Sequence, residues 1–158
     1  VRARYDYSDA HGPDYSRHPV VPYWTDAERT LLELPLTSVF WGMLRKQGQQ
    51  LFPLARKLPL LGGALAKLGL LERIGLTPEG VTKEEALRAV DIAIDDGLPV
   101  LVLSFHSPSL APGNTPYVRS QADLERLFDW LRGVYAHLAT CGVTPTTVRD
   151  TWAAAQHA

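Results

Sequence analysis

The passage from an apolar run into a proline-rich segment, at residues 100–118, constrains the fold of this chain more than any other feature. Residues 100–105 are rich in β-branched and large apolar side chains and follow Pro99, a pattern typical of a buried parallel strand. The segment that follows holds three prolines and a glycine, which exclude both a helix and a strand ladder. The sequence therefore predicts a strand over residues 100–105 that opens into a stiff loop.

His106 lies where this predicted strand ends. Because α/β folds gather ligands at the carboxyl ends of parallel strands, a titratable imidazole is well placed for catalysis here. Ser104 and Ser107 flank it and are candidates for substrate binding. The alternative is that His106 only hydrogen-bonds the loop at the end of the strand, and its position in the sequence leaves both interpretations open.

Helices are predicted on both sides of this strand. Residues 82–96 begin with a capping box of Thr82 and Glu85 and end at Gly97. Residues 120–140 form a longer amphipathic helix with Ser120 as its N-cap, and Thr146 or Thr147 starts a last helix. The apolar side chains at helical spacing in the first of these helices predict one buried face: Leu87, Val90 and Ile94.

The region before residue 82 is less regular. Residues 30–34 are a short strand candidate that Pro35 ends. Residues 37–76 predict several short helical pieces, the first capped by Ser38, because glycines and prolines interrupt the apolar pattern. A spacing of three between apolar residues near the end of this region predicts one helix face: Leu65, Leu68, Leu71 and Ile74.

Residues 1–29 are predicted to form an aromatic and acidic loop, because they show neither helical nor strand periodicity. Aromatic rings beside carboxylates suit a carbohydrate surface, although such a loop can also simply cover the core. His11, Asp14 and His18 match no compact metal-ligand motif, so we assign no metal ligands in the chain.

The order of these elements predicts an α/β fold with right-handed crossovers and a parallel sheet. Only the strands at residues 30–34 and 100–105 are convincing, and two parallel strands cannot bury both faces of a sheet. We therefore expect residues 1–158 to form a single partial domain, with the loop at 1–29 and an α/β core at 30–158.

Charge and composition exclude several classes of partner. A net charge of −1 with scattered basic residues disfavours nucleic-acid binding. No window of about 18 residues is uninterruptedly apolar, so we expect no membrane span. One cysteine, Cys141, excludes an intrachain disulfide and cannot make a thiolate zinc site, and we interpret it as a small residue at a helix end.

Three stretches carry a resemblance to a known family: DYSDAHGPDYS, GLTPEGVTKEEALRAVDIAIDDG and LVLSFHSPSLAPGNTPYV. With them the chain resembles the polysaccharide deacetylase (NodB-homology) family, and within it a bacterial branch associated with cell-wall or exopolysaccharide clusters. The likeness covers most of the 158 residues but corresponds only to the carboxyl-terminal part of the family domain. It implies the carboxyl-terminal portion of a deformed (β/α) barrel, incomplete in this chain.

The resemblance implies a hydrolase that removes N- or O-acetyl groups from a polysaccharide or oligosaccharide with the help of a divalent metal such as zinc. The metal ligands of the family lie in an aspartate pair after the first strand and in a His-x-x-x-His motif, and neither motif occurs here. The resemblance therefore places the ligands in a missing amino-terminal part of the same domain. We expect the 158-residue chain by itself to be inactive.

One catalytic residue carries over, because His106 matches the family histidine that acts as the general acid. Hydrolysis of an amide or ester requires protonation of the departing nitrogen or oxygen, and an imidazolium is a competent donor near neutral pH. Ser104 stands where the family usually has a leucine that lines the acetyl pocket, which leaves the acyl preference open.

Two other functions remain open. In a non-catalytic carbohydrate-binding or lost-activity homologue, the aromatic loop would bind sugar and His106 would only form hydrogen bonds. A serine hydrolase would use one of the serines beside His106, but the G-x-S-x-G motif is absent. Side chains one or two positions apart on a strand also diverge, which disfavours a nucleophile directly beside the histidine.

Overall fold

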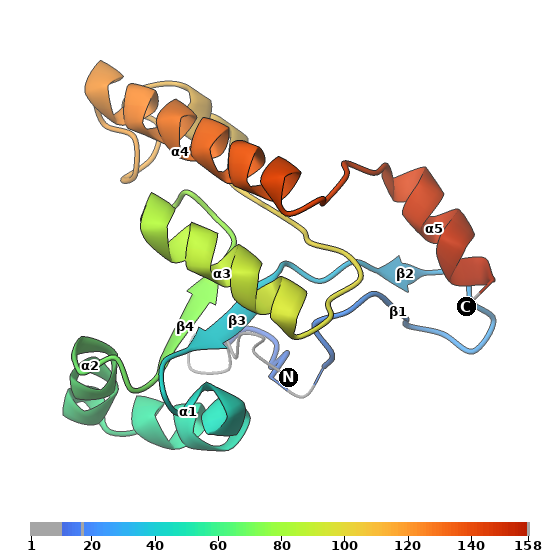
Figure 1. Cartoon of the computed structure of the whole chain (residues 1–158), viewed down its shortest axis with the longest axis horizontal. Coiled ribbons are helices and arrows are strands. Elements are labelled where there is room, and N and C mark those ends of the chain that lie inside the picture. The colour runs from blue at the N-terminus through green and yellow to red at the C-terminus, as the bar shows by residue number, and fades with distance from the viewer. Residues whose placement is uncertain (1–10, 17, 158) are drawn as a thin grey trace.

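In the structure, a computed structural model that describes residues 11–16 and 18–157, helices and short strands form a mixed α/β arrangement (Figure 1). The predicted α/β class is confirmed. Residues 1–10 and 17, which belong to the predicted loop over residues 1–29, lie outside the described residues. The elements are β1 (Tyr23–Trp24), β2 (Leu32–Glu33), β3 (Ser38–Trp41), the 3₁₀ turn η2 (Arg45–Gln47), α1 (Gly48–Arg56), α2 (Pro59–Lys67), β4 (Glu72–Gly75), α3 (Lys83–Asp95), the 3₁₀ turn η3 (Ser107–Leu110), α4 (Gln121–Thr140) and α5 (Val148–Gln156).

The sheets are antiparallel, which corrects the predicted parallel sheet. β1 pairs with β2, and β3 pairs with β4 from Ser38 opposite Gly75 to Trp41 opposite Glu72. Each sheet has two strands within the part of the chain that the structure describes. Ser38 begins a strand and caps no helix, so the prediction of helical pieces throughout residues 37–76 holds only for α1 and α2.

The predicted helix face from Leu65 to Ile74 is also wrong. α2 ends at Lys67, and Gly69 takes a left-handed conformation with φ of 64°. Glycine adopts this conformation without steric cost, so the chain turns here and Ile74 enters β4 instead of continuing the helix. The four apolar residues therefore have helical spacing in the sequence, but they do not lie on one helix in the structure.

Residues 100–105 run past the ends of β3 and β4 without forming a strand ladder, which corrects the predicted strand. Val102 O accepts a hydrogen bond from Thr37 N (3.1 Å), and Ser104 N donates to Leu76 O (3.2 Å). Val102 N donates to the hydroxyl oxygen of Thr37 at 2.7 Å. The Val102 N–H is therefore bonded to a side chain and not to a backbone carbonyl of a neighbouring strand. The strand pairing does not continue at this point. The apolar character of the segment is still used, because Leu101 packs into two core clusters.

Helix α3 lies between the β3–β4 sheet and α4 (Figure 1). The predicted capping box is present, with Thr82 and Glu85 each bonding the other's backbone N–H, and Gly97 ends the helix with φ of 70°. Only Val90 of the predicted apolar face is fully buried, and Ile94 is exposed. Small side chains dominate the buried positions instead, since they let the helix approach two partners closely: Ala86, Ala89, Val90, Ile92 and Ala93.

Helix α4 is found at Gln121–Thr140 with Ser120 as its N-cap, as predicted. Its buried side chains are Leu127, Trp130 and Val134, and the indole N–H of Trp130 donates to Val81 O at 3.0 Å. Its exposed positions mix charged residues with apolar and aromatic ones, among them Phe128 and Tyr135. Like the other helices of the described part, it is not apolar enough over a sufficient length to cross a membrane.

The β1–β2 hairpin and helix α5 lie together at one end of the molecule (Figure 1). Thr147 caps α5, as predicted, and the rings of Trp24 and Trp152 meet edge to face with centroids 6.1 Å apart. β2 falls inside the predicted strand at residues 30–34, whereas its partner β1 falls inside the predicted loop. The antiparallel partner of β2 therefore comes from the predicted loop.

The Thr37 hydroxyl offers a direct test of how residues 100–105 are held. Thr37→Val keeps the shape of the side chain but leaves the Val102 N–H without its acceptor in a part-buried setting, so we expect the free energy of unfolding to fall by about 1–3 kcal/mol. Thr37→Ser, which keeps the hydroxyl, is the control and should lose less. Urea unfolding of the three proteins measures the difference, and equal losses in both variants would contradict the assignment.

Candidate functional site

The imidazole of His106 stands at the surface, directly before η3. His106 is the N-cap residue of this 3₁₀ turn, and 78% of its side chain is exposed. The turn begins at Ser107 and Pro108, a residue that favours the first position of a helical turn. The backbone therefore places an accessible ring at the start of a rigid loop.

A buried carboxylate holds this histidine. Only 6% of the Glu79 side chain is exposed, and its Oε2 lies 2.6 Å from Nδ1 of His106. Its Oε1 accepts from the backbone N–H of His106 at 3.0 Å and from the hydroxyl of Ser109 at 2.6 Å. Glu79 thus fixes both the backbone and the ring of His106.

Further hydrogen bonds stiffen the loop behind the histidine. Ser109 is completely buried, and its hydroxyl oxygen lies 3.0 Å from that of Thr115. Thr115 in turn accepts from Val118 N, and Gly113 N donates to Val118 O at 2.8 Å. Gly113 has a φ of 86°, which closes this turn. The predicted stiff loop is therefore present, with a buried polar network at its centre.

The environment of Glu79 sets its charge. Burial raises the pKa of the carboxyl, because it removes the charged form from water. The hydrogen bonds from Ser109 and from the side chain and backbone of His106 together outweigh burial and hold the pKa below its ordinary value of 4.5. At neutral pH Glu79 is therefore a carboxylate that can only accept hydrogen bonds. Nδ1 of His106 therefore donates its proton to Glu79, and Nε2 is the ring nitrogen that takes no part in this contact.

The serines predicted as substrate-binding residues occupy different settings. Ser104 is half-buried, and its backbone N–H is bonded to Leu76 O. Ser107 is exposed at the start of η3, beside His106 in the chain. Ser109, a further serine of this stretch, is buried and donates to Glu79, so it cannot serve as the nucleophile of a serine hydrolase.

A cavity of about 380 Å³ lies beside this loop. Pro78, next to Glu79, and Tyr117 and Val118 of the loop form one part of its wall. Residues from α3 and α4, including Lys83 and Trp130, form the rest. His106 does not line this cavity, so the imidazole and the hollow are neighbouring but separate features of the surface.

The described part of the aromatic loop has its own contacts. The hydroxyl of Tyr23 lies 3.1 Å from Nδ1 of His18, and the rings of Tyr15 and His18 meet edge to face. Asp14 accepts a hydrogen bond from Ser16 N. These contacts engage His18 and Asp14 with neighbours within the loop.

Sequence reasoning identified His106 but missed Glu79 and Ser109. Glu79 is 27 residues from His106 in the chain, and its local sequence, Pro78 to Gly80, indicates only a turn. Ser109 has no sequence signal that separates it from the neighbouring serines. Folding brings Glu79 to both His106 and Ser109.

Comparisons with protein-family models, with curated proteins and with solved structures gave no significant match to this chain. The geometry of Glu79, His106 and Ser109 therefore carries the functional argument.

The lowered pKa of Glu79 makes a prediction about stability and pH. The stabilisation from this group is fully present above its ordinary pKa of 4.5 and is lost as the pH falls through the lower pKa of the folded state. Glu79→Gln removes the charge, so we expect it to lower the free energy of unfolding by about 1–3 kcal/mol at neutral pH and by less at about pH 3.

Urea unfolding of wild type and variant at a series of pH values measures this difference. Glu28→Gln, at an exposed acidic position between β1 and β2, is the control and should show little change. A difference for Glu79→Gln that stays constant across the series would contradict a stabilising carboxylate.

Proposed function

We propose that this chain is part of a metal-dependent hydrolase resembling polysaccharide deacetylases, in which His106 is the general acid. The observation that carries the proposal is the exposed imidazole of His106 held at Nδ1 by the buried carboxylate of Glu79. General acids need a fixed geometry and a proton on the nitrogen that faces the substrate. A carboxylate partner supports both requirements, because it orients the ring and stabilises the imidazolium.

The proton transfer follows from the arrangement of the two nitrogens. Nδ1 keeps its proton in the hydrogen bond to Glu79, and Nε2 of the imidazolium donates to the leaving nitrogen or oxygen when the tetrahedral intermediate collapses. The C–N or C–O bond breaks as this proton arrives, and the imidazole is left neutral. Glu79 is a positioning residue in this scheme, since it touches the ring and not the substrate.

The motifs that hold the metal in the resembled family are not present in this chain. The sequence has no His-x-x-x-His motif. Its adjacent aspartates, Asp95 and Asp96, lie at the end of α3 and not after a strand, and both approach Arg45. We therefore assign the metal to the amino-terminal part of the same domain and derive no step through it here.

The proposal extends to the deformed (β/α) barrel. The order β4, α3 and then residues 100–105 supports it, because Ser104 of the last segment is hydrogen-bonded to Leu76 at the end of β4. A strand, a covering helix and a return beside the strand form the repeating unit of such barrels. In this proposal residues 100–105 become a full strand when the remaining part of the barrel is present.

The proposed substrate is a polysaccharide or oligosaccharide with acetyl groups. The cavity beside the loop offers Tyr117 and several charged side chains, which suit the apolar faces and hydroxyl edges of a sugar ring. Ser104, in place of a leucine, is proposed to make the acyl pocket more polar, and exposed Ser107 is proposed to contact the substrate beside His106.

Kinetics of His106→Ala in the protein that contains the whole domain test the assignment. We expect turnover to fall by roughly two to four orders of magnitude, since general acid catalysis contributes about that much, while the metal content stays unchanged. The loss should be far greater for an acetamide substrate than for an activated ester, whose leaving group needs little protonation.

Two outcomes would remove His106 from this role: equal losses on both substrates, or loss of the metal. Glu125→Gln, at an exposed position on α4, serves as the control and should leave turnover unchanged.

The sequence encoded upstream separates the two main functions. An aspartate pair and a His-x-x-x-His motif there favour the enzyme, and their absence favours a carbohydrate-binding homologue.

A further inference from the structure

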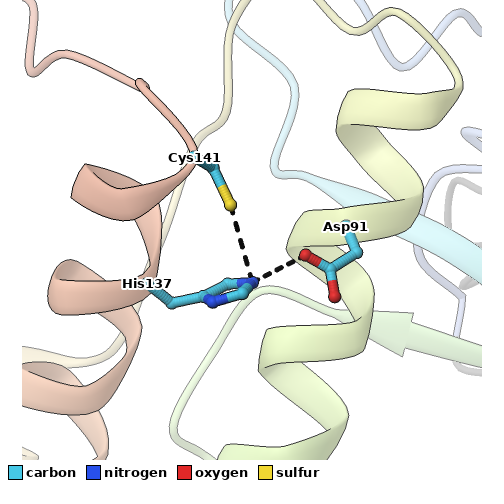
Figure 2. A group of neighbouring side chains, drawn as sticks. All are labelled: Asp91, His137 and Cys141. Carbon is cyan, nitrogen blue, oxygen red and sulfur yellow. Dashed lines mark hydrogen bonds and ion pairs between the residues drawn. The ribbon is translucent and has the colours of Figure 1, made fainter.

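Three metal-ligating side chains meet between α3 and α4, and none of them belongs to the His106 site. Asp91 comes from α3, His137 from the last turn of α4 and Cys141 from the residue that ends α4 (Figure 2). Nε2 of His137 lies 2.6 Å from Oδ1 of Asp91 and 3.7 Å from Sγ of Cys141. One ligand atom from each residue lies within 4.8 Å of the other two.

The same three residue types could form a catalytic triad, but the geometry excludes it. In a triad the base uses one ring nitrogen toward the nucleophile and the other toward the carboxylate. Here both the carboxylate and the sulfur face Nε2, as Figure 2 shows. Nitrogen, oxygen and sulfur ligand atoms held within 4.8 Å of one another are instead an arrangement that a metal ion can bridge.

We propose that Asp91, His137 and Cys141 bind a divalent metal ion of the zinc class. A donor set of imidazole, thiolate and carboxylate matches a borderline-soft ion better than magnesium or calcium, which prefer oxygen ligands. Cys141 is exposed, and 57% of the Asp91 side chain is exposed, so a fourth position is open to water. This proposal departs from the prediction that one cysteine cannot make a thiolate zinc site, because folding brings an imidazole and a carboxylate to the cysteine.

Two of the three separations in the cluster can be compared directly with those around such an ion, and the third lies within 4.8 Å. Tetrahedral zinc with Zn–N and Zn–O bonds of about 2.1 Å and a Zn–S bond of about 2.3 Å separates nitrogen from sulfur by about 3.6 Å and nitrogen from oxygen by about 3.4 Å. The separation of Nε2 and Sγ already agrees. The carboxylate must move back by less than about 1 Å from its hydrogen bond to Nε2, which the exposure of Asp91 allows.

Core packing holds the helices on both sides of the cluster. Val90, next to Asp91, and Val134, one turn before His137, are both completely buried in the same core cluster. His137 and Cys141 are one helical turn apart, so their side chains share a face. The carbonyl groups at the end of α4 carry a partial negative charge, which favours a bound cation at this position.

Binding requires a balanced exchange of protons. The thiol of Cys141 gives up its proton to solvent and binds as the thiolate. In neutral His137, Nε2 gives up the proton that it shares with Asp91, and Nδ1 carries one instead, so the imidazole stays neutral. The ion therefore replaces one shared proton with bonds to all three side chains and clamps α3 to α4.

Titration of the reduced 158-residue chain with Co²⁺ tests the site. Cobalt occupies zinc sites, and a bound thiolate gives a near-ultraviolet charge-transfer band together with intense visible bands of tetrahedral geometry. We expect these bands to saturate at one equivalent and to disappear when Zn²⁺ is added. Cys141→Ser should abolish the charge-transfer band, and His137→Gln and Asp91→Asn should each weaken binding by about tenfold or more.

Matched controls separate this site from other ligands of the chain. His157→Gln alters an exposed histidine at the end of α5, and it should leave the titration unchanged. The bands should also vanish in urea, because the unfolded chain does not hold the three residues together. Absence of the charge-transfer band in wild type, an unchanged titration in Cys141→Ser, or one cobalt per two chains would each overturn the proposal.

The inference does not depend on the proposed hydrolase. His106→Gln should leave the cobalt titration unchanged, whereas it should impair the proposed proton transfer. Loss of the cobalt bands in His106→Gln with the same secondary structure by circular dichroism would contradict a site formed by Asp91, His137 and Cys141.

Discussion

The close packing of helix α3 against two partners is the constraint on which the rest of the structure depends. Alanines at three of its buried positions let the helix approach the β3–β4 sheet on one side and α4 on the other. A larger side chain at Ala86, Ala89 or Ala93 would separate these layers, since each of the three is completely buried. Residues 100–105 then pass beside the same helix, and Leu101 completes the core on both sides.

The candidate site is a consequence of this packing. The turn that enters α3 carries Glu79, and the segment that leaves α3 ends at His106, so one helix brings both residues to the same edge of the core. A buried carboxylate is costly unless fixed donors surround it. The His106 backbone, the His106 ring and the Ser109 hydroxyl supply those donors, and in doing so they hold the loop rigid. The same contacts therefore compensate the charge of the Glu79 carboxylate and orient the imidazole of His106.

The cluster of Asp91, His137 and Cys141 uses the same helix pair in a different way. Its carboxylate and its thiol are exposed, and their partners converge on one nitrogen. At the Glu79 site the carboxylate is satisfied by hydrogen bonds from His106 and Ser109. The second cluster holds a nitrogen, an oxygen and a sulfur ligand atom within 4.8 Å of one another, which is why we assign it to a cation.

Local signals in the sequence determined the helices α3, α4 and α5, because Thr82, Ser120 and Thr147 cap their own helices and glycines end the first two. They also singled out His106 and the stiff loop behind it. Only the tertiary structure decided the pairing of β3 with β4, the absence of a ladder at residues 100–105, and the partners Glu79 and Ser109. The reason is physical: a cap or a turn depends on side chains within about four residues, whereas strand pairing and buried hydrogen bonds depend on residues that only folding brings together.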